Sequence, residues 1–397
     1  MTGAIRKFFL ANLLDTLGSG MYLPYAVLFV KDHVGLNMRD LGVALSGGVV
    51  LAFAAIPLSA LVTRRYGPKL VSVISMVLRA IAFLAFLWVH GLIPFIVLSG
   101  IVGLGDRTWS VASKVLIKDL VPPDNRSLWL GRNRIIRNLG FLFGGVLGAV
   151  LAHASAKTNY GLVVIVNAAS FLAASSILIT INSAAKPTQP TPQKGGGVPV
   201  VLTNSVAVRF LVSLLSVGFL YVVLNMVVPL YAVKISGGMT WLPGFLFGLN
   251  SMAVVIFQEP VLRATQRVGD AGRVALGSIV LGSSYVAFLT AGQSDRLLST
   301  GVLIIAMLLF SVGEQLFFAP STAILLHLAN SGQEGAYMAA YQGVFAFDNM
   351  IGPVLVSFLV RSSFSYGGLW IALAALAFLG AALQRFTASK ASHALTD

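Results

Sequence analysis

Twelve apolar segments of about twenty residues follow one another along this chain, and they fix the environment in which it can fold. A helix needs about twenty apolar residues to cross the hydrocarbon core of a bilayer. Of the 397 residues, 57% are apolar and only 10% are charged, whereas a soluble domain carries about 25% charged residues. The segments are expected at 6–30, 39–63, 68–89, 92–117, 128–152, 160–182, 206–233, 241–263, 272–291, 297–325, 335–360 and 366–386.

The segments are predicted to be helices, because lipid offers no hydrogen bonds to the backbone and a helix satisfies its own. The fold class that follows is an all-α membrane protein with twelve transmembrane helices. Residues 184–204 are rich in proline and glycine and predict a semi-extended linker. The linker separates an N-terminal bundle of six helices over 1–183 from a C-terminal bundle of six helices over 205–397.

The basic residues are distributed unequally between the two sides of this predicted membrane domain. Nineteen of the 27 lysines and arginines are assigned to the side that holds both termini and the linker and six to the other side, while Arg79 and Arg107 are counted apart as intramembrane charges. Such an excess marks the cytoplasmic side, so we expect a multi-pass protein of the cell membrane with both termini in the cytoplasm. The net charge of +14 is therefore attributed to orientation, and no nucleic-acid partner is expected.

Two stretches of the chain repeat each other 208 residues apart, each with an acid in an apolar span. Gly105-Asp106 matches Gly313-Glu314, and Gly144-Gly145 matches Gly352-Pro353 at the same offset. A membrane protein duplicated in this way has the layout of a secondary transporter whose site lies where the repeats meet.

We single out six charged residues within the predicted spans, since a charge near the helix centre costs roughly 3 kcal/mol. They are Asp15, Arg79, Asp106, Arg107, Glu314 and Asp348. Intramembrane charges that are retained despite this cost predict a polar interior pathway for substrate or protons.

Each charge also has a purely structural explanation. Arg79 could be a fixed ion-pair partner of Asp15 or of Asp106. Asp106 and Arg107 are consecutive, point about 100° apart on a helix, and cannot both face one small site squarely. Asp348 could simply hold the bend before Gly352-Pro353.

Polar and aromatic side chains accompany the acids and are candidates for lining a substrate cavity. They are Tyr22, Tyr25, Trp109, Tyr221, Asn225 and Gln315. Aromatic rings near a carboxylate suit a lipophilic or cationic substrate, whereas tyrosines in the membrane interface are the alternative for the first two. The chain has no cysteine, which excludes disulfides and thiolate metal sites; no metal and no cofactor are expected, and a proton gradient would be the driving force.

The fifth span carries glycines in the pattern G-x8-G-x3-G-G-x2-G-A. The glycines that begin and continue it are Gly131, Gly140, Gly144, Gly145 and Gly148. Glycines at four-residue spacing let a neighbouring helix approach closely, so tight packing explains part of this pattern.

With this pattern the chain resembles the major facilitator superfamily, in particular its twelve-helix drug:proton antiporter branch. The antiporter motif of that branch reads G-x8-G-x3-G-P-x2-G-G, so Gly145 stands where proline is usual and Ala149 where glycine is. Gly352-Pro353 keeps a Gly-Pro at the equivalent place in span eleven. The superfamily's loop between spans two and three reads G-x-x-x-D-R-x-G-R-R/K; Arg65, Gly67 and Lys69 match it, while Arg64 replaces the acid.

The resemblance implies a proton-driven carrier in which spans one, four, seven and ten line a central cavity. Asp15, Asp106, Arg107 and Glu314 fall on those spans. We therefore expect a monomeric exporter of a small amphipathic compound, in contact only with lipid, substrate and protons.

Two other functions stay open at this point. An importer or a lipid-handling carrier would share the fold and run in another direction, and vesicle flux under a pH gradient would separate these. A membrane enzyme or a receptor is the third possibility. It lacks support, because no loop carries a metalloprotease, nucleophile-elbow or phosphate-binding motif.

Overall fold

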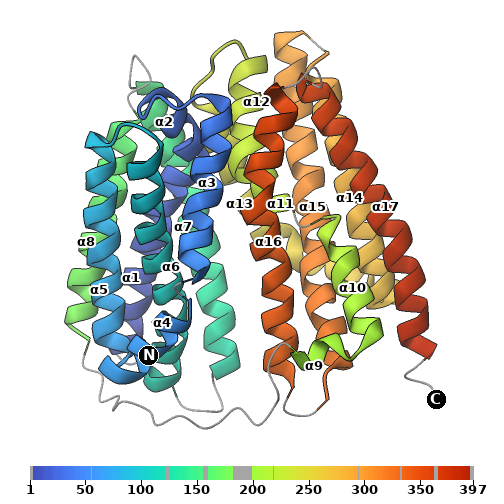
Figure 1. Cartoon of the computed structure of the whole chain (residues 1–397), viewed down its shortest axis with the longest axis horizontal. Helices are drawn as coiled ribbons and strands as arrows, with labels where there is room; N and C mark the ends of the chain where they lie inside the picture. The colour runs from blue at the N-terminus through green and yellow to red at the C-terminus, as the bar shows by residue number, and fades with distance from the viewer. Residues whose placement is uncertain are drawn as a thin grey trace. The chain divides into compact units, whose positions relative to one another are not determined.

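The computed structural model confirms an all-helical membrane fold (Figure 1). It describes residues 3–54, 56–121, 126–154, 160–181, 199–217, 219–293, 295–330, 333–361 and 365–393. Within these ranges, eleven helical segments are long and apolar enough to cross a membrane. The predicted span 39–63 corresponds to two shorter helices, α3 (Met38–Ala54) and α4 (Ile56–Tyr66), on either side of a residue that is not described.

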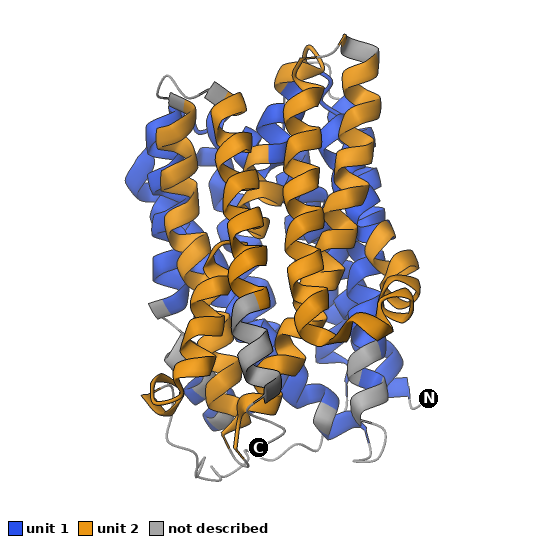
Figure 2. Ribbon diagram, turned by 90° about the vertical axis from the view of Figure 1, so that its right-hand side faces the viewer, with its two compact units in different colours: residues 1–190, 228–233, 239–252 blue, residues 191–227, 234–238, 253–397 orange. Residues whose placement is uncertain are grey.

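The chain divides into two compact units (Figure 2). Unit 1 comprises residues 1–190, 228–233 and 239–252, and unit 2 comprises the remainder. The predicted linker falls mostly on residues 182–198, which lie outside the described part, so the linker and the domain boundaries at 183 and 205 stay predictions.

Unit 1 is built on α1 (Gly3–Tyr22), which packs against two later helices, α7 (Arg126–Ala154) and α8 (Gly161–Ile179). A short 3-10 turn, η1 (Leu23–Tyr25), and α2 (Ala26–Asp32) continue α1. The helix α5 (Pro68–Ala85), extended by η2 (Phe86–Trp88), packs on α6 (Leu92–Leu120) and on α8, and α3 packs on α6. An aromatic cluster fills the space between them: the Phe83 ring lies 4.7 Å from Tyr22 and 5.5 Å from Phe171, centroid to centroid.

Unit 2 is organised around α14 (Gly269–Ala291), which packs against α15 (Arg296–Leu328) and α17 (Ser365–His393). The 3-10 turn η5 (Gln266–Val268) leads into α14. Short helices α9 (Pro199–Leu202) and α10 (Ser205–Leu215) pack on α16 (Glu334–Arg361). Stacked aromatic rings hold α14 to α17, with the Phe288 and Trp370 centroids 4.7 Å apart.

The predicted continuous helix over 206–233 is wrong in one respect, because the helix is interrupted. After α10 ends at Leu215, the helix resumes as α11 (Leu220–Val222), a π-helical turn η4 (Val223–Val227) and α12 (Val228–Ile235). The hydroxyl of Ser216 donates to the carbonyl oxygen of Ser213 at 2.7 Å, and serine bonds of this kind compete with helical backbone bonds.

Each unit, taken by itself, uses glycines at positions that the internal repeat makes equivalent. Gly67 before α5 and Gly269 at the start of α14 both have positive φ, +84° and +71°, which only glycine adopts freely. A Cβ at Gly105 of α6 would lie 3.2 Å from the Ser75 carbonyl oxygen on α5, and one at Gly313 of α15 would lie 3.0 Å from the Gly277 carbonyl oxygen on α14. The two helix pairs thus use equivalent glycines for their closest approach.

The glycines of the fifth span hold α7 close to two other helices. A Cβ at Gly144 would lie 2.3 Å from the Leu17 carbonyl oxygen on α1. On another face of α7, a Cβ at Gly145 would lie 2.8 Å from the Gly244 carbonyl oxygen on α13 (Leu242–Ala264). This second contact is why residues 239–252 cluster with unit 1 although they follow the predicted linker.

Candidate substrate and proton-coupling site

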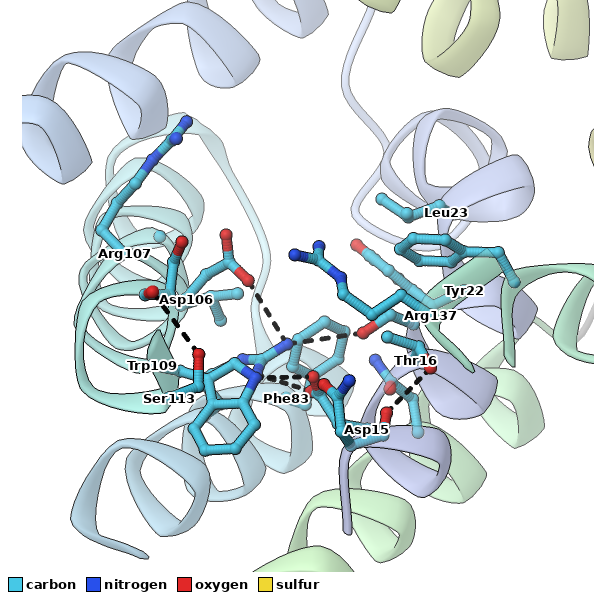
Figure 3. A pocket seen from close by; sticks show the side chains of 18 of the residues that line it. Asp15, Thr16, Tyr22, Leu23, Phe83, Asp106, Arg107, Trp109, Ser113 and Arg137 are labelled. Carbon is cyan, nitrogen blue, oxygen red and sulfur yellow. Dashed lines mark hydrogen bonds and ion pairs between the residues drawn. The ribbon is translucent and has the colours of Figure 1, made fainter. Parts of the chain in front are cut away.

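Unit 1 contains a cavity of about 410 Å³ with three arginines and two aspartates in its wall (Figure 3). Its walls come from α1, η1, α5, α6, α7 and α8. The lining residues are Asn12, Asp15, Thr16, Ser19, Tyr22, Leu23, Arg79, Phe83, Ser99, Val102, Gly103, Asp106, Arg107, Trp109, Ser110, Ser113, Asn133, Arg137, Phe141 and Asn167.

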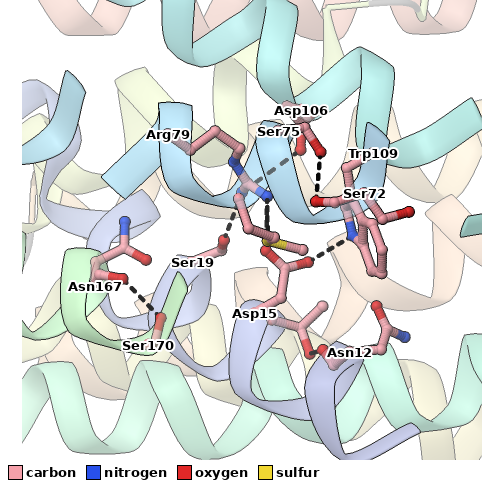
Figure 4. Close-up of polar contacts among 12 residues, drawn as sticks. Asn12, Asp15, Ser19, Ser72, Ser75, Arg79, Asp106, Trp109, Asn167 and Ser170 are labelled. Carbon is pink, nitrogen blue, oxygen red and sulfur yellow. Dashed lines mark hydrogen bonds and ion pairs between the residues drawn. The ribbon is translucent and has the colours of Figure 1, made fainter. Parts of the chain in front are cut away.

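Arg79 of α5 joins two acids from different helices at the wall of this cavity (Figure 4). Its Nη1 lies 2.7 Å from Oδ1 of Asp15 on α1, and its Nη2 lies 3.7 Å from Oδ1 of Asp106 on α6. The sequence left the partner of Arg79 open between these two acids, and the structure shows that the guanidinium group serves both. A planar guanidinium with five N–H donors can do this, whereas an ammonium presents a single point of charge.

The Arg79 side chain is held in place by contacts besides its ion pairs. Its guanidinium carbon lies 3.9 Å from the centroid of the Phe171 ring on α8, an arrangement that attracts a cation. A Cβ at Gly105 would lie 2.6 Å from Cγ of Arg79. The absence of a side chain at Gly105 therefore leaves room for the aliphatic part of the Arg79 side chain. This is a physical reason for glycine at position 105.

The two acids have very different surroundings. Both oxygens of Asp15 are bonded, because the indole Nε1 of Trp109 donates to Oδ2 at 2.9 Å while Arg79 binds Oδ1. The Asp15 side chain is 6% exposed and that of Asp106 is 56% exposed. Asp15 is therefore a fixed counter-charge to Arg79, and Asp106 is the acid that water or substrate in the cavity can reach.

The consecutive residues Asp106 and Arg107 point in different directions, as the helical geometry predicts. Figure 3 shows the Arg107 side chain extending away from the labelled Asp106 carboxylate. Its guanidinium carbon lies 4.3 Å from the centroid of the Phe53 ring on α3. Both residues line the cavity, but only Asp106 contacts Arg79.

Six of the predicted site residues thus surround one cavity: Asp15, Tyr22, Arg79, Asp106, Arg107 and Trp109. Sequence reasoning missed Arg137 and Asn133 of α7, which line it as well. Arg137 was counted among the basic residues that set the orientation. Arg137 lies three residues before Gly140 and seven before Gly144, which places all three on one face of the helix. This spacing could have predicted Arg137 as a site residue.

Tyr25 lies elsewhere, so its prediction as a cavity residue is not met by this cavity. Its side chain is fully buried, and its hydroxyl accepts a hydrogen bond from the Gly244 backbone N–H at 3.2 Å. The same hydroxyl donates to the Trp241 carbonyl oxygen at 3.4 Å. Tyr25 therefore fastens η1 to the start of α13.

The remaining candidates lie in unit 2, and what they do there stays a prediction. Glu314 is half-buried on α15, and the neighbouring Gln315 is buried and donates from Nε2 to the Ser311 carbonyl oxygen at 3.0 Å. Asn225 of the π-helical turn donates to the backbone carbonyl of Tyr221 at 2.9 Å.

Asp348 of α16 is almost fully buried, at 1% exposure, and its Oδ2 has no hydrogen-bond partner among the described residues. A buried polar atom without a partner is costly, and whether Asp348 takes part in transport or holds the Gly352-Pro353 bend stays a prediction. The Cβ of an alanine at 352 would lie 2.7 Å from Val222 of α11, so close helix packing explains this glycine.

The loop between α4 and α5 keeps the residues that matched the family motif. Arg65 and Lys69 flank Gly67, whose φ of +84° makes the turn into α5. The guanidinium carbon of Arg65 lies 5.6 Å from the centroid of the adjacent Tyr66 ring. Whether this loop latches a gate stays a prediction.

Comparison with known proteins agrees with the fold. The profile of the Major Facilitator Superfamily matches residues 8–298, so this chain belongs to that superfamily and is a transporter rather than an enzyme. It is 22% identical over 354 residues to the MFS-type transporter YqjV of Bacillus subtilis, covering 87% of this chain and 83% of the relative. It is 23% identical to the multidrug resistance protein MdtH of Aeromonas hydrophila, covering 88% and 86%.

Solved structures of transporters share the fold at low sequence identity. The nucleoside transporter NupG superposes with a TM-score of 0.80 at 12% identity, covering 97% of this chain and 99% of that one. A D-xylose-proton symporter superposes with a TM-score of 0.75 at 16% identity, covering 96% of each. At these identities the likeness shows the fold alone.

Proposed function

We propose that this protein is a proton-coupled secondary transporter that exports a small amphipathic compound across the cell membrane. The observation that carries the proposal is the sharing of Arg79 between a buried acid and an accessible acid at the wall of a cavity. The relatives named MdtH support export of a drug-like compound. The proposed protein needs no cofactor, works as a monomer and keeps both termini in the cytoplasm.

The proposed coupling uses the difference between the two ion pairs. Asp15 holds Arg79 at 2.7 Å, whereas Asp106 lies 3.7 Å away and is open to the cavity. Protonation of Asp106 removes one of the two negative charges beside Arg79 and leaves the other in place. The charge presented to a substrate in the cavity therefore changes by one unit, which ties substrate affinity to the proton.

Glu314 is proposed as a second proton carrier, because it occupies the position equivalent to Asp106 in the internal repeat. We expect Glu314→Gln to abolish coupled export while the protein still folds. Full activity of that variant would remove Glu314 from the mechanism.

Import together with a proton is the second candidate. The described cavity wall holds three arginines and two aspartates. The excess of positive charge favours an anion, and the negative charge of the bound anion in turn favours protonation of a nearby carboxylate. Flux into liposomes under an imposed pH gradient separates the two directions. Exchange alkalinises the compartment that takes up substrate, and symport acidifies it.

Asp106→Asn tests the proposed role of the accessible acid. Asparagine keeps the size of the side chain and removes the proton site, so we expect accumulation driven by a pH gradient to fall to the level of empty liposomes. Exchange of labelled for unlabelled substrate needs no net proton movement and should persist. The substrate is first chosen from a compound panel by its stabilisation of the purified protein, which grows with concentration over Kd.

Ser110→Ala is the matched control, because Ser110 lines the same cavity on the same helix without an ionisable group. It should keep gradient-driven accumulation. Equal accumulation by Asp106→Asn and the wild type would show that Asp106 does not carry the coupling proton.

A further inference from the structure

We infer that the cavity of unit 1 binds an amphipathic organic anion, with Arg137 as the residue that receives the carboxylate or phosphate group. This inference rests on the proposed transport function and specifies the substrate class of the same site. Because an anion binds more tightly when Asp106 is protonated, it favours the candidate in which substrate and proton move together. It goes against the cationic substrate that aromatic rings near a carboxylate suggest.

The first reason is the charge of the cavity wall. Its ionised side chains are Arg79, Arg107 and Arg137 against Asp15 and Asp106. Asp15 is fully engaged by Arg79 and Trp109, and Asp106 lies 3.7 Å from the same guanidinium. Arg107 and Arg137 form no ion pair in the described part of the chain.

The second reason is the state of Arg137 itself. Figure 3 shows its side chain extending from α7 into the cavity. Its side chain is exposed, and no acid in the described part of the chain forms an ion pair with it. A guanidinium presents parallel N–H donors that match a carboxylate or a phosphate, so Arg137 is a free, correctly placed anion receptor.

The apolar part of the wall fits the remainder of such a ligand. Tyr22, Leu23, Phe83, Val102 and Phe141 line the cavity beside the arginines. A ligand with an aromatic or aliphatic body and one anionic group would bury its body against these side chains and direct its charge at Arg137. Pockets of this kind take their affinity from apolar contacts and their orientation from a few polar groups.

Three naphthalene compounds that differ only in their polar group test this inference. The full-length protein is placed in nanodiscs of phosphatidylcholine, and thermal stabilisation is titrated with 1-naphthaleneacetate, 1-naphthalenemethylamine and 1-naphthalenemethanol. We expect the carboxylate to stabilise the protein at the lowest concentration. In Arg137→Gln, its apparent Kd should rise about tenfold, as expected for the loss of a hydrogen-bonded charge of about 1.4 kcal/mol, while the alcohol is unaffected.

Arg134→Gln is the matched control, because Arg134 is an exposed arginine on α7 that does not line the cavity. It should bind all three compounds as the wild type does. Tighter binding of the amine than of the carboxylate, or an unchanged Kd in Arg137→Gln, would overturn the inference.

Two further measurements distinguish a soluble anion from a lipid headgroup as the ligand, and anion binding from proton coupling. If added phosphatidylglycerol weakens naphthaleneacetate binding in the wild type but not in Arg137→Gln, the anion that the site takes includes lipid headgroups, and the inference stands with that source. The Asp106→Asn variant should bind naphthaleneacetate more tightly than the wild type, because it removes a negative charge from the cavity wall. A failure of proton coupling is thereby distinguished from a failure of anion recognition.

Discussion

Replacing Arg79 with glutamine is expected to destabilise the protein by about 3–5 kcal/mol, the cost of removing one partner of a buried ion pair. The Arg79 and Asp15 side chains are 5% and 6% exposed, so water cannot compensate Asp15 when its partner is lost. On the scale of a domain of similar size, the midpoint of thermal unfolding should fall by roughly 10 °C. Thermal unfolding of the purified variant measures it.

Replacing the other partner, Asp15, should lower the stability less than replacing Arg79 does. The difference between the two variants makes the prediction specific. In Asp15→Asn, Arg79 keeps Asp106, an exposed side chain that can close its 3.7 Å separation. Trp109 can still donate to the remaining oxygen of the amide. We therefore expect Asp15→Asn to lie between the wild type and Arg79→Gln in stability.

The double variant Asp15→Asn with Arg79→Gln removes both buried charges and should be more stable than Arg79→Gln alone. Transport should be lost in all three variants, since the two acids no longer share a cation. If Arg79→Gln unfolded at the wild-type temperature, the ion pair would not be the buried contact that the structure shows.

Gly144→Leu is the second substitution with a large expected effect. A Cβ at this position would lie 2.3 Å from the Leu17 carbonyl oxygen and 2.9 Å from the Gly20 Cα. Both are backbone atoms of α1, so the helix itself must move. Overpacking of this kind costs about 1–3 kcal/mol or more, and thermal unfolding of the purified protein should show it.

Gly343→Leu on α16 is the matched control, because no atom lies within 4 Å of a Cβ at that glycine. It should unfold at or slightly above the wild-type temperature, since a helix interior disfavours glycine by about 1 kcal/mol. Equal unfolding temperatures for both leucine variants would contradict the close contact of α1 with α7.

Composition and spacing were sufficient to predict the helices and the duplication. A span of twenty apolar residues has few alternatives in lipid, so α5, α6 and α8 follow directly from segment length. The interruption of span seven was missed because Ser216 and Val217 stand within an apolar run, and hydropathy reports composition rather than helix continuity.

The duplication predicted the site only in part, because the two repeats differ at the position of Arg79. Gly105 of α6 packs against Arg79, whereas the equivalent Gly313 of α15 packs against Leu281. The position of the shared arginine therefore carries a leucine in the second repeat. Asp106 and Glu314 are equivalent in sequence but have different neighbours, which a repeat alignment alone does not reveal.

The sequence also could not predict which charged side chains on different helices form ion pairs. The sequence offered Asp15 and Asp106 as alternative partners of Arg79, since the rotation of each helix about its axis is uncertain by a few positions. The structure brings both to the same guanidinium. Arg137 lies inside the predicted span 128–152 and was not singled out as an intramembrane charge, and the folded helix shows that it lines the cavity.

The most direct test of the central claim is the number of protons exchanged when a substrate binds. A stabilising compound is added to purified wild-type protein and to Asp106→Asn in weakly buffered solution, and the change in pH is recorded. Protons should move on binding to the wild type, with release for exchange and uptake for symport, and Asp106→Asn should show no such change. The same proton exchange in both proteins, or none in either, would contradict coupling through the acid that shares Arg79 with Asp15.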